Sequence, residues 1–319
     1  MTIKSFLKLV EIQTKIASVT PFMLGIAFTL YYFDTLNVLT VLAFFVSLLC
    51  FDMFTTALNN YKDFKKAIKK EGYNYEFHNA IGQFNLKEST VVATIITLFS
   101  VAVIFGVITF LRTDYVLLLL GALSFLMGIL YSAGPIPISR TCFGEVFSGL
   151  FMGFFIPFLV IYASVLTQNP VVISLDSSIL SITLNWRVLL PILLISLPTV
   201  FCIANIMLAN NICDVEDDFE NRRYTLPIQV GREKALILFD VLYILTYIDI
   251  IICVILGYLP VISLIALLTA IKVYGNVKAF HKVQTKKDTF AFSVMNLVLI
   301  AVPIILTLFV GYVFKILAG

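Results

Sequence analysis

Two polar stretches of this 319-residue chain combine carboxylates and amides at helical spacing. Asn59 and Asp63 are four residues apart, and Asn210, Asp214 and Asp218 repeat the same interval. Residues four apart lie on one face of an α-helix. Carboxylate and amide oxygens are ligands that suit Mg²⁺, which in proteins often bridges carboxylates to substrate phosphates. If the two faces turn towards each other, they predict a magnesium site for a phosphorylated substrate.

Basic side chains accompany both stretches, and we expect Lys62, Lys65, Arg222 and Arg223 to neutralise diphosphate oxygens. A guanidinium offers a bidentate fork and an ammonium a point charge. The alternative is that each stretch is only a solvated loop at a helix end. A start of two Asn residues, followed by an Asp four positions after one of them, occurs in both stretches and favours a site.

The composition places these stretches in a membrane protein. Hydrophobic residues make up 60% of the chain and charged residues only 13%, whereas soluble domains are about 25% charged. A formal net charge of +3 indicates no nucleic-acid partner. The five Cys residues are scattered without a CxxC pair, which favours reduced thiols over a disulfide framework or a zinc site. No removable signal peptide is recognised.

Nine segments are apolar and long enough to span a bilayer. They are residues 16–33, 37–60, 90–111, 115–133, 143–166, 187–210, 235–257, 259–275 and 291–314. The polar stretches between them are only loop-sized, so we expect one all-α integral-membrane domain over residues 1–319. Prolines inside the spans are tolerated where neighbouring helices satisfy the freed carbonyls.

The basic residues predict the orientation of the spans. With a cytoplasmic N-terminus, all but three of the 22 Lys and Arg residues fall in cytoplasmic segments, the exceptions being Arg112, Arg187 and Lys315. This is the distribution that the positive-inside rule describes. It places both polar stretches on the cytoplasmic side of a cell membrane.

At the two polar stretches the sequence resembles the UbiA superfamily of intramembrane aromatic prenyltransferases. Within that superfamily it resembles most the branch that prenylates 1,4-dihydroxy-2-naphthoate in menaquinone synthesis. The branch pattern N-D-Y-x-D is matched by Asn59–Asp63, with Asn60 in place of Asp. The pattern N-N-x-x-D-x-x-x-D, then a basic residue and T-L, is matched by Asn210–Asp218, Arg223, Thr225 and Leu226. The pattern Y-[ST]-x-G-P-x-P, leading to G-E, is matched by Tyr131–Pro137 and Gly144-Glu145. The resemblance covers nearly the whole chain and implies the nine-helix UbiA bundle.

The first motif departs from the family pattern. Asn60 replaces an Asp, Lys69 stands where a third Asp is often found, and the Arg-Pro pair near the start of span one is missing. Asp63 is then the only carboxylate of this motif. Asp52 lies on roughly the same helical face as Asn59 and either compensates for the missing acid or bonds a neighbouring helix. For Asn60 the alternative is likewise a hydrogen bond to a neighbouring helix.

By resemblance, Mg²⁺ is held by Asn59, Asp63, Asn210, Asp214 and Asp218, and grips the diphosphate of an allylic polyprenyl donor. An electron-rich carbon of an aromatic acid then attacks the allylic cation, and the ring carboxyl leaves as CO₂. The expected catalytic residues are Asp63, Asp214, Asp218 and Tyr131. The expected substrate-binding residues are Asn60, Lys62, His78, Arg140, Arg222 and Arg223.

Two alternatives stay open at the level of sequence. The acceptor could be another aromatic compound such as 4-hydroxybenzoate. A secondary transporter would instead place polar residues near the bilayer midplane of interrupted helices, where this sequence has few charges.

Overall fold

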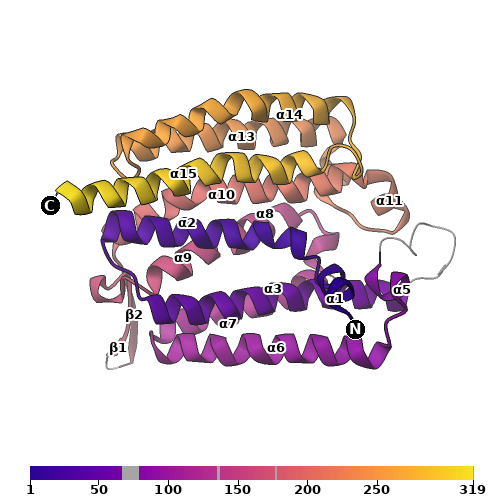
Figure 1. The fold of residues 1–319 in the computed structure, drawn as a ribbon, viewed down its shortest axis with the longest axis horizontal. Coiled ribbons are helices and arrows are strands. Elements are labelled where there is room, and N and C mark those ends of the chain that lie inside the picture. The colour runs from indigo at the N-terminus through magenta and orange to yellow at the C-terminus, as the bar shows by residue number, and fades with distance from the viewer. Residues whose placement is uncertain (67–78, 135–136, 177, 319) are drawn as a thin grey trace. The chain divides into compact units, whose positions relative to one another are not determined.

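The computed structural model describes residues 1–66, 79–134, 137–176 and 178–318 (Figure 1). Within these ranges nine helices are long and apolar enough to cross a membrane, which confirms the expected number of spans. The end of the eighth differs most from expectation: the predicted span 259–275 continues to Lys282. Long basic side chains extend the helix there because their stems pack on apolar surface while their charges reach water.

The chain divides into two compact units. The first unit, Met1–Ser18 with Leu39–Gly134, contains α1 (Ile3–Leu9), η1 (Ile12–Lys15), the start of α2 (Ile16–Phe33), and then α3 (Val38–Lys66), α5 (Ala80–Gln83), α6 (Glu88–Leu111) and α7 (Tyr115–Ser132). A buried apolar cluster joins α1, α3, α5 and α6; it comprises Leu9, Val10, Phe54, Ala57, Ala80, Ile81, Val91, Ile95 and Leu98. This cluster fixes the end of α3, which carries the first motif.

Helix α7 approaches α3 closely because Gly128 has no side chain. A Cβ at this position would meet the ring of Phe51 at 2.5 Å, well inside van der Waals contact. The Phe51 ring also stacks on Phe125 of α7, with centroids 4.1 Å apart. Small residues allow this close approach in membrane helices, where packing rather than hydrophobic burial drives association.

The second unit, Val19–Val38 with Pro135–Gly319, is built around the long helix α10. Its elements after α2 are η2 (Ile138–Arg140), α8 (Gly144–Ser148), η3 (Gly149–Phe154), α9 (Phe155–Tyr162), η4 (Leu166–Gln168), β1 (Val171–Asp176), β2 (Ile179–Leu184), α10 (Trp186–Cys213), α11 (Val215–Glu220), α12 (Leu226–Val230), α13 (Arg232–Ile255), η5 (Val261–Thr269), α14 (Ala270–Lys282) and α15 (Ala291–Ala318). Helix α10 packs against α8, η3, α13 and α15.

A proline inside the fifth span shows how α10 supports its neighbours. Pro157 has no N–H to offer the carbonyl of Gly153 one turn earlier, and the preceding turn η3 widens to a π-helix. The Thr199 hydroxyl of α10 donates to that Gly153 carbonyl at 2.8 Å. A neighbouring helix therefore satisfies the carbonyl that the proline leaves free, as expected from the sequence.

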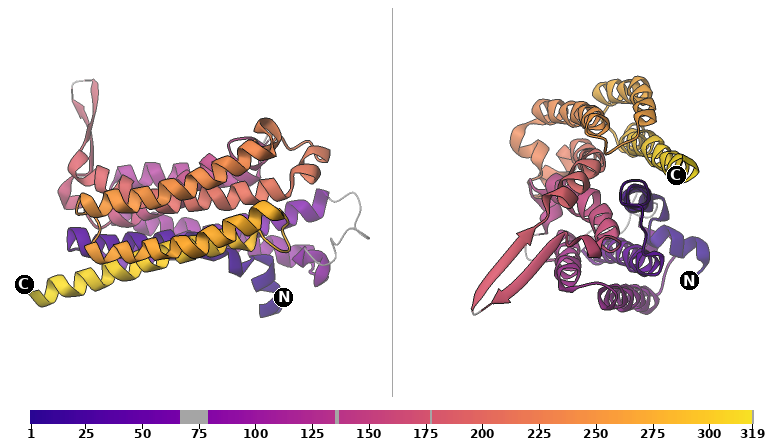
Figure 2. Two further views of the ribbon diagram at one scale, coloured as in Figure 1. Left: turned by 90° about the horizontal axis from the view of Figure 1, so that it is seen from above. Right: turned by 90° about the vertical axis from the view of Figure 1, so that its left-hand side faces the viewer.

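The antiparallel hairpin β1–β2 has no counterpart among the sequence-based expectations. Its register pairs Val171 with Leu184 and Asp176 with Ile179. Ile, Leu and Val alternate with Ser and Thr through much of it, which is the period of a strand rather than a helix. The hairpin projects sideways from the end of α10, across the direction of that helix (Figure 2).

Candidate active site

The end of α3 carries the first motif on unbroken helix. Because α3 continues to Lys66, Asn59 and Asp63 lie one turn apart on the same face, and both are exposed. Lys62 precedes Asp63 and is half-buried. The helix thus keeps the spacing on which the magnesium hypothesis depends, with Asn59 and Asp63 as its oxygen donors.

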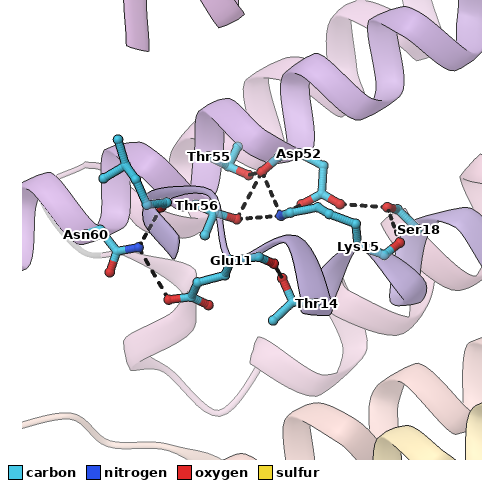
Figure 3. A network of polar contacts seen from close by, with 9 residues as sticks. Glu11, Thr14, Lys15, Ser18, Asp52, Thr55, Thr56 and Asn60 are labelled. Atoms are coloured by element: carbon cyan, nitrogen blue, oxygen red, sulfur yellow. Dashed lines mark hydrogen bonds and ion pairs between the residues drawn. The ribbon is translucent and has the colours of Figure 1, made fainter. Parts of the chain in front are cut away.

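Asn60 turns its amide towards the N-terminal segment. Its Nδ2 donates to the Leu9 carbonyl at 2.9 Å and to the Glu11 carboxylate at 3.3 Å (Figure 3). The backbone carbonyl of Asn60 accepts from the Asn79 side chain at 2.8 Å. These contacts correspond to the structural alternative for Asn60, a hydrogen bond to a neighbouring segment. A part in substrate binding stays a prediction.

Asp52 is occupied by a buried ion pair deeper in the same helix (Figure 3). Its Oδ1 lies 2.5 Å from the Nζ of Lys15, and its Oδ2 accepts from Ser18 at 2.6 Å. Lys15 also donates to Thr56 at 2.7 Å, and its side chain is only 4% exposed. Asp52 therefore bonds the start of the first span, the second of its two sequence-based interpretations.

The second motif spans a break between two helices. Helix α10 ends at Cys213, Asp214 leaves the helical conformation at φ −105°, ψ 12°, and α11 begins at Val215. The expected single face through Asn210, Asp214 and Asp218 is thus interrupted at its middle residue. The backbone N–H of Asp218 still donates to the Asp214 carbonyl at 2.7 Å, which keeps the two acids one turn apart.

Asp214 and Asp218, the two acids of the second motif, each form an ion pair with a basic side chain. Asp214 Oδ2 lies 2.5 Å from Lys286 Nζ, and Asp218 Oδ1 lies 3.1 Å from Arg223 Nε. Thr225 donates to the other oxygen of Asp218 at 3.2 Å. Burial raises the pKa of the Asp218 carboxyl, and the Arg223 guanidinium opposes that rise. Lys286, from the segment between α14 and α15, is a site candidate that sequence reasoning missed, because one Lys in a basic loop carries no distinguishing signal.

Behind this motif, Asn211 rather than Asn210 is fully buried. Its Nδ2 donates to Glu145 Oε1 at 2.8 Å, and Glu145 at the start of α8 is itself buried. Sequence reasoning assigned neither residue a role of its own. A carboxylate in an apolar span was the available signal, since such residues are costly and usually serve a site. The pair ties the last turn of α10, which carries Asn210, to α8.

The loop before α8 is joined to the segment after α11. The N–H of Tyr224 donates to the Arg140 carbonyl at 3.0 Å, and Arg223 Nη2 donates to the Ser139 carbonyl at 3.3 Å. The structure therefore brings the backbone of Ser139 and Arg140 next to Arg223, which pairs with Asp218. Arg222 is exposed and adopts a left-handed conformation, φ 54°.

Tyr131 and His78 complete the set of expected site residues. Tyr131 lies in the last turn of α7 and is half-buried. His78 lies outside the described residues. Glu216, Asp217 and Glu220 of α11 are exposed, and Glu216 pairs with Arg232 at 2.7 Å.

The donor chemistry of the second motif fits Mg²⁺. Asn210, Asp214 and Asp218 supply hard oxygen donors, and the cations paired with the two acids are of the kind that binds phosphate. In the described part of the chain, no three His, Cys, Asp or Glu side chains form a group that could hold a metal ion. Mg²⁺ that keeps several waters and binds through one or two carboxylates and substrate phosphates needs no such group.

In the part of the chain that the structure describes, nine apolar helices define a multi-pass membrane protein, and acid–cation pairs lie at the end of one of these helices. Residues 18–311 match the UbiA prenyltransferase family. The chain belongs to this family, which is a family of transferases.

Individual relatives agree with this assignment. The chain is 29% identical over 245 residues to the 1,4-dihydroxy-2-naphthoate octaprenyltransferase of Bacillus subtilis (strain 168), covering 77% of this chain and 72% of the relative. The apo structure of a UbiA homologue from Aeropyrum pernix K1 is similar with a TM-score of 0.67 at 15% identity, covering 92% of this chain and 98% of the other. A UbiA homologue from Archaeoglobus fulgidus, bound to DMAPP and Mg²⁺, gives a TM-score of 0.61 at 13% identity, covering 97% and 99%. These structural likenesses confirm the UbiA fold.

Proposed function

We propose that this protein transfers a polyprenyl chain from an allylic polyprenyl diphosphate to an aromatic acceptor, specifically 1,4-dihydroxy-2-naphthoate, in menaquinone biosynthesis. The observation that carries the proposal is the pairing of both acids of the second motif with cations, Asp214 with Lys286 and Asp218 with Arg223. The choice of acceptor rests on the Bacillus subtilis relative.

The acid–cation pairs suit an exchange of partners when substrate binds. A diphosphate that enters with its metal offers each cation a phosphate oxygen and each carboxylate a metal ion. Lys286 and Arg223 would then bind the diphosphate, and the residues that would hold Mg²⁺ are Asp214, Asp218 and Asn210 of the second motif with Asn59 and Asp63 of the first. Bound Mg²⁺ would neutralise charge on the leaving diphosphate.

The protein's own cations act as the carbon–oxygen bond of the donor breaks. Negative charge grows on the diphosphate, and Lys286 and Arg223, assisted by Lys62 and Arg222, stabilise that charge. The acceptor ring carbon forms a bond to the allylic carbon, and the ring carboxylate leaves as CO₂, which restores aromaticity. Arg140, close to Arg223, is suited to bind the acceptor carboxylate through its guanidinium. Tyr131 and His78 remain candidates for acceptor contacts.

The location of the reaction is part of the proposal. The Lys and Arg distribution supports a cytoplasmic N-terminus and a site on the cytoplasmic side of the cell membrane. The apolar prenyl chain would then remain in the bilayer while its diphosphate meets the basic helix ends.

Purified protein in lipid nanodiscs tests the proposal directly. We would incubate it with a polyprenyl diphosphate, Mg²⁺ and, separately, 1,4-dihydroxy-2-naphthoate, 4-hydroxybenzoate or no acceptor, and analyse products by mass spectrometry. We expect prenylated, decarboxylated naphthoate that disappears with EDTA. Turnover of 4-hydroxybenzoate alone would refute the acceptor, and no prenylated product with any acceptor would refute the activity.

A further inference from the structure

The hairpin β1–β2 separates its residue types onto two faces. Residues paired across antiparallel strands point to the same side, and successive residues alternate sides. The pairs Val171–Leu184, Ile173–Ile182 and Leu175–Leu180 therefore form one entirely apolar face. The intervening pairs, Val172–Thr183, Ser174–Ser181 and Asp176–Ile179, put three hydroxyl groups on the other face, which also carries the aliphatic Val172 and Ile179.

Most of the apolar face is exposed in the described structure. Leu175 is 75% exposed, Leu180 63% and Ile182 61%. A two-stranded hairpin is at best marginally stable in water without a surface to pack on. Six adjoining aliphatic side chains therefore indicate a partner for this face.

The base of the hairpin is fixed at the end of a membrane span. Asn185 donates its N–H to the Pro170 carbonyl at 2.9 Å and its side-chain amide to the Gln168 carbonyl at 2.9 Å. Helix α10 begins at the next residue, Trp186, which is 63% exposed. Tryptophan at the end of a span is typical of the membrane–water interface. The hairpin thus starts at the level of the bilayer surface.

The direction of the hairpin keeps it at the level of the bilayer surface. It runs across the axis of α10 in both views of Figure 2. Because α10 crosses the bilayer, a hairpin that leaves its end sideways extends along the membrane surface. An apolar face of this kind suits the boundary between headgroups and acyl chains, where amphipathic segments lie in the interface plane.

A second copy of the chain is a weaker match for this surface. Strands of six residues are about 20 Å long, and two of them make a face about 10 Å wide, on the order of 200 Å². A stable protein–protein interface needs about 800 Å² from each partner. Residues 171–175 and 178–184 contain no Lys or Arg. Binding of the hairpin to lipid would therefore not depend on anionic headgroups.

We propose that the hairpin Val171–Leu184 is an interfacial anchor. Its apolar face lies on the acyl chains at the bilayer surface, and its hydroxyl-bearing face contacts water and headgroups. The anchor is independent of the prenyl-transfer proposal, since it involves none of the residues assigned to the active site.

Tryptophan fluorescence tests this anchor, because Trp186 is the only tryptophan in the chain. In a Trp186→Phe background, Ile182→Trp places a probe on the apolar face, and Thr183→Trp places a matched probe on the opposite face one residue away. Each variant would be reconstituted in phosphatidylcholine vesicles with lipids brominated near the glycerol end of the acyl chain. The unaltered chain, with Trp186 at the interface, is the positive control for quenching.

We expect quenching of the Ile182→Trp probe to be at least twofold stronger than that of the Thr183→Trp probe. It should not change when anionic lipid is added or when protein is diluted in lipid. Equal quenching of the two probes would overturn the proposal. A blue-shifted Ile182→Trp emission that bromolipid does not quench, and that shifts red on dilution, would identify a second copy as the partner instead.

Discussion

At the scale of single residues, the second motif is where charge is concentrated and paired. Asp214 and Asp218 hold Lys286 and Arg223, whereas the neighbouring Asp217 is exposed and lies outside these ion pairs. Three Asp residues within five positions therefore differ in environment although they look alike in sequence. This difference provides a matched control for mutagenesis.

We predict that Asp214→Ala and Asp218→Ala each lower the rate of prenyl transfer about 10²-fold or more, comparable to removing one strong charge-stabilising contact. Asp217→Ala should leave the rate within about twofold, because surface substitutions away from a site have small effects. Initial rates at saturating donor and acceptor measure all three variants. A full rate in either of the first two would remove the second motif from the chemistry.

The hydrogen bonds of the Asn60 side chain predict how a substitution at this position changes stability. Asn60→Asp replaces an amide donor by a carboxylate facing the Leu9 carbonyl and the Glu11 carboxylate. Loss of the donor beside these two acceptors should cost about 1–3 kcal/mol, visible as a lower Tm in detergent. Adding Glu11→Gln should recover part of the loss, because a Gln amide can donate to the new carboxylate.

The same variant separates the two interpretations of Asn60. If this position contributes to metal binding, Asn60→Asp should lower the Mg²⁺ concentration for half-maximal rate. A lower Tm with an unchanged Mg²⁺ response would assign Asn60 to structure alone. Asp63→Asn should raise the Mg²⁺ requirement, because it removes the only carboxylate of the first motif.

At the scale of elements, the first unit contains a buried ion pair between the end of η1 and the middle of α3. Lys15 and Asp52 are 37 residues apart, and the Lys15 ammonium is nearly excluded from solvent. The pair sits seven residues before Asn59 on α3. The ion pair therefore holds α3, the helix that carries the first motif, against the N-terminal segment.

We predict that Asp52→Ala destabilises the protein by about 3–5 kcal/mol, because it leaves the Lys15 charge buried and unpaired. The double variant Lys15→Met with Asp52→Leu should be much closer to the parent, since no charge remains in the apolar site. Ser18 and Thr56 keep backbone acceptors, the carbonyls of residues 15 and 52. Thermal unfolding in detergent distinguishes the variants, and equal losses in the two would contradict a buried-charge origin.

At the scale of the whole molecule, the distribution of basic residues predicts which loops face the cytoplasm. The segment between α14 and α15 contains Lys286 and Lys287, whereas the hairpin segment between α9 and α10 has no Lys or Arg from Ser178 to Leu184. The positive-inside rule therefore places these two segments on opposite sides of the membrane.

Cysteine labelling in intact cells measures this topology. In a background lacking the five native cysteines, Ser181→Cys should react with a membrane-impermeant maleimide and Gln284→Cys should react only after permeabilisation. Both positions are in exposed or half-exposed segments, so access to reagent is not limited by folding. Labelling of Gln284→Cys in intact cells would reverse the proposed orientation.

The sequence alone determined the spans, the spacing of the motif residues and the family. Hydropathy and the 3.6-residue period are local properties, so the sequence alone predicted the nine apolar helices of the described ranges and the shared face of Asn59 and Asp63. The same reasoning failed at Asp214, where a helix predicted to continue instead breaks. It also left out the hairpin, whose short apolar runs resemble the end of a span.

Only the tertiary structure decided the partners of the polar residues. Glu145 meets Asn211 across 66 positions, and Asp214 meets Lys286 from a loop two spans away. Asn60 and Asp52 have hydrogen-bond partners in the N-terminal segment although their spacing also suited a metal site. Sequence spacing places a side chain on a helical face, but which group lies opposite depends on how distant helices pack, because buried polar groups bond to whatever partner that packing brings within reach.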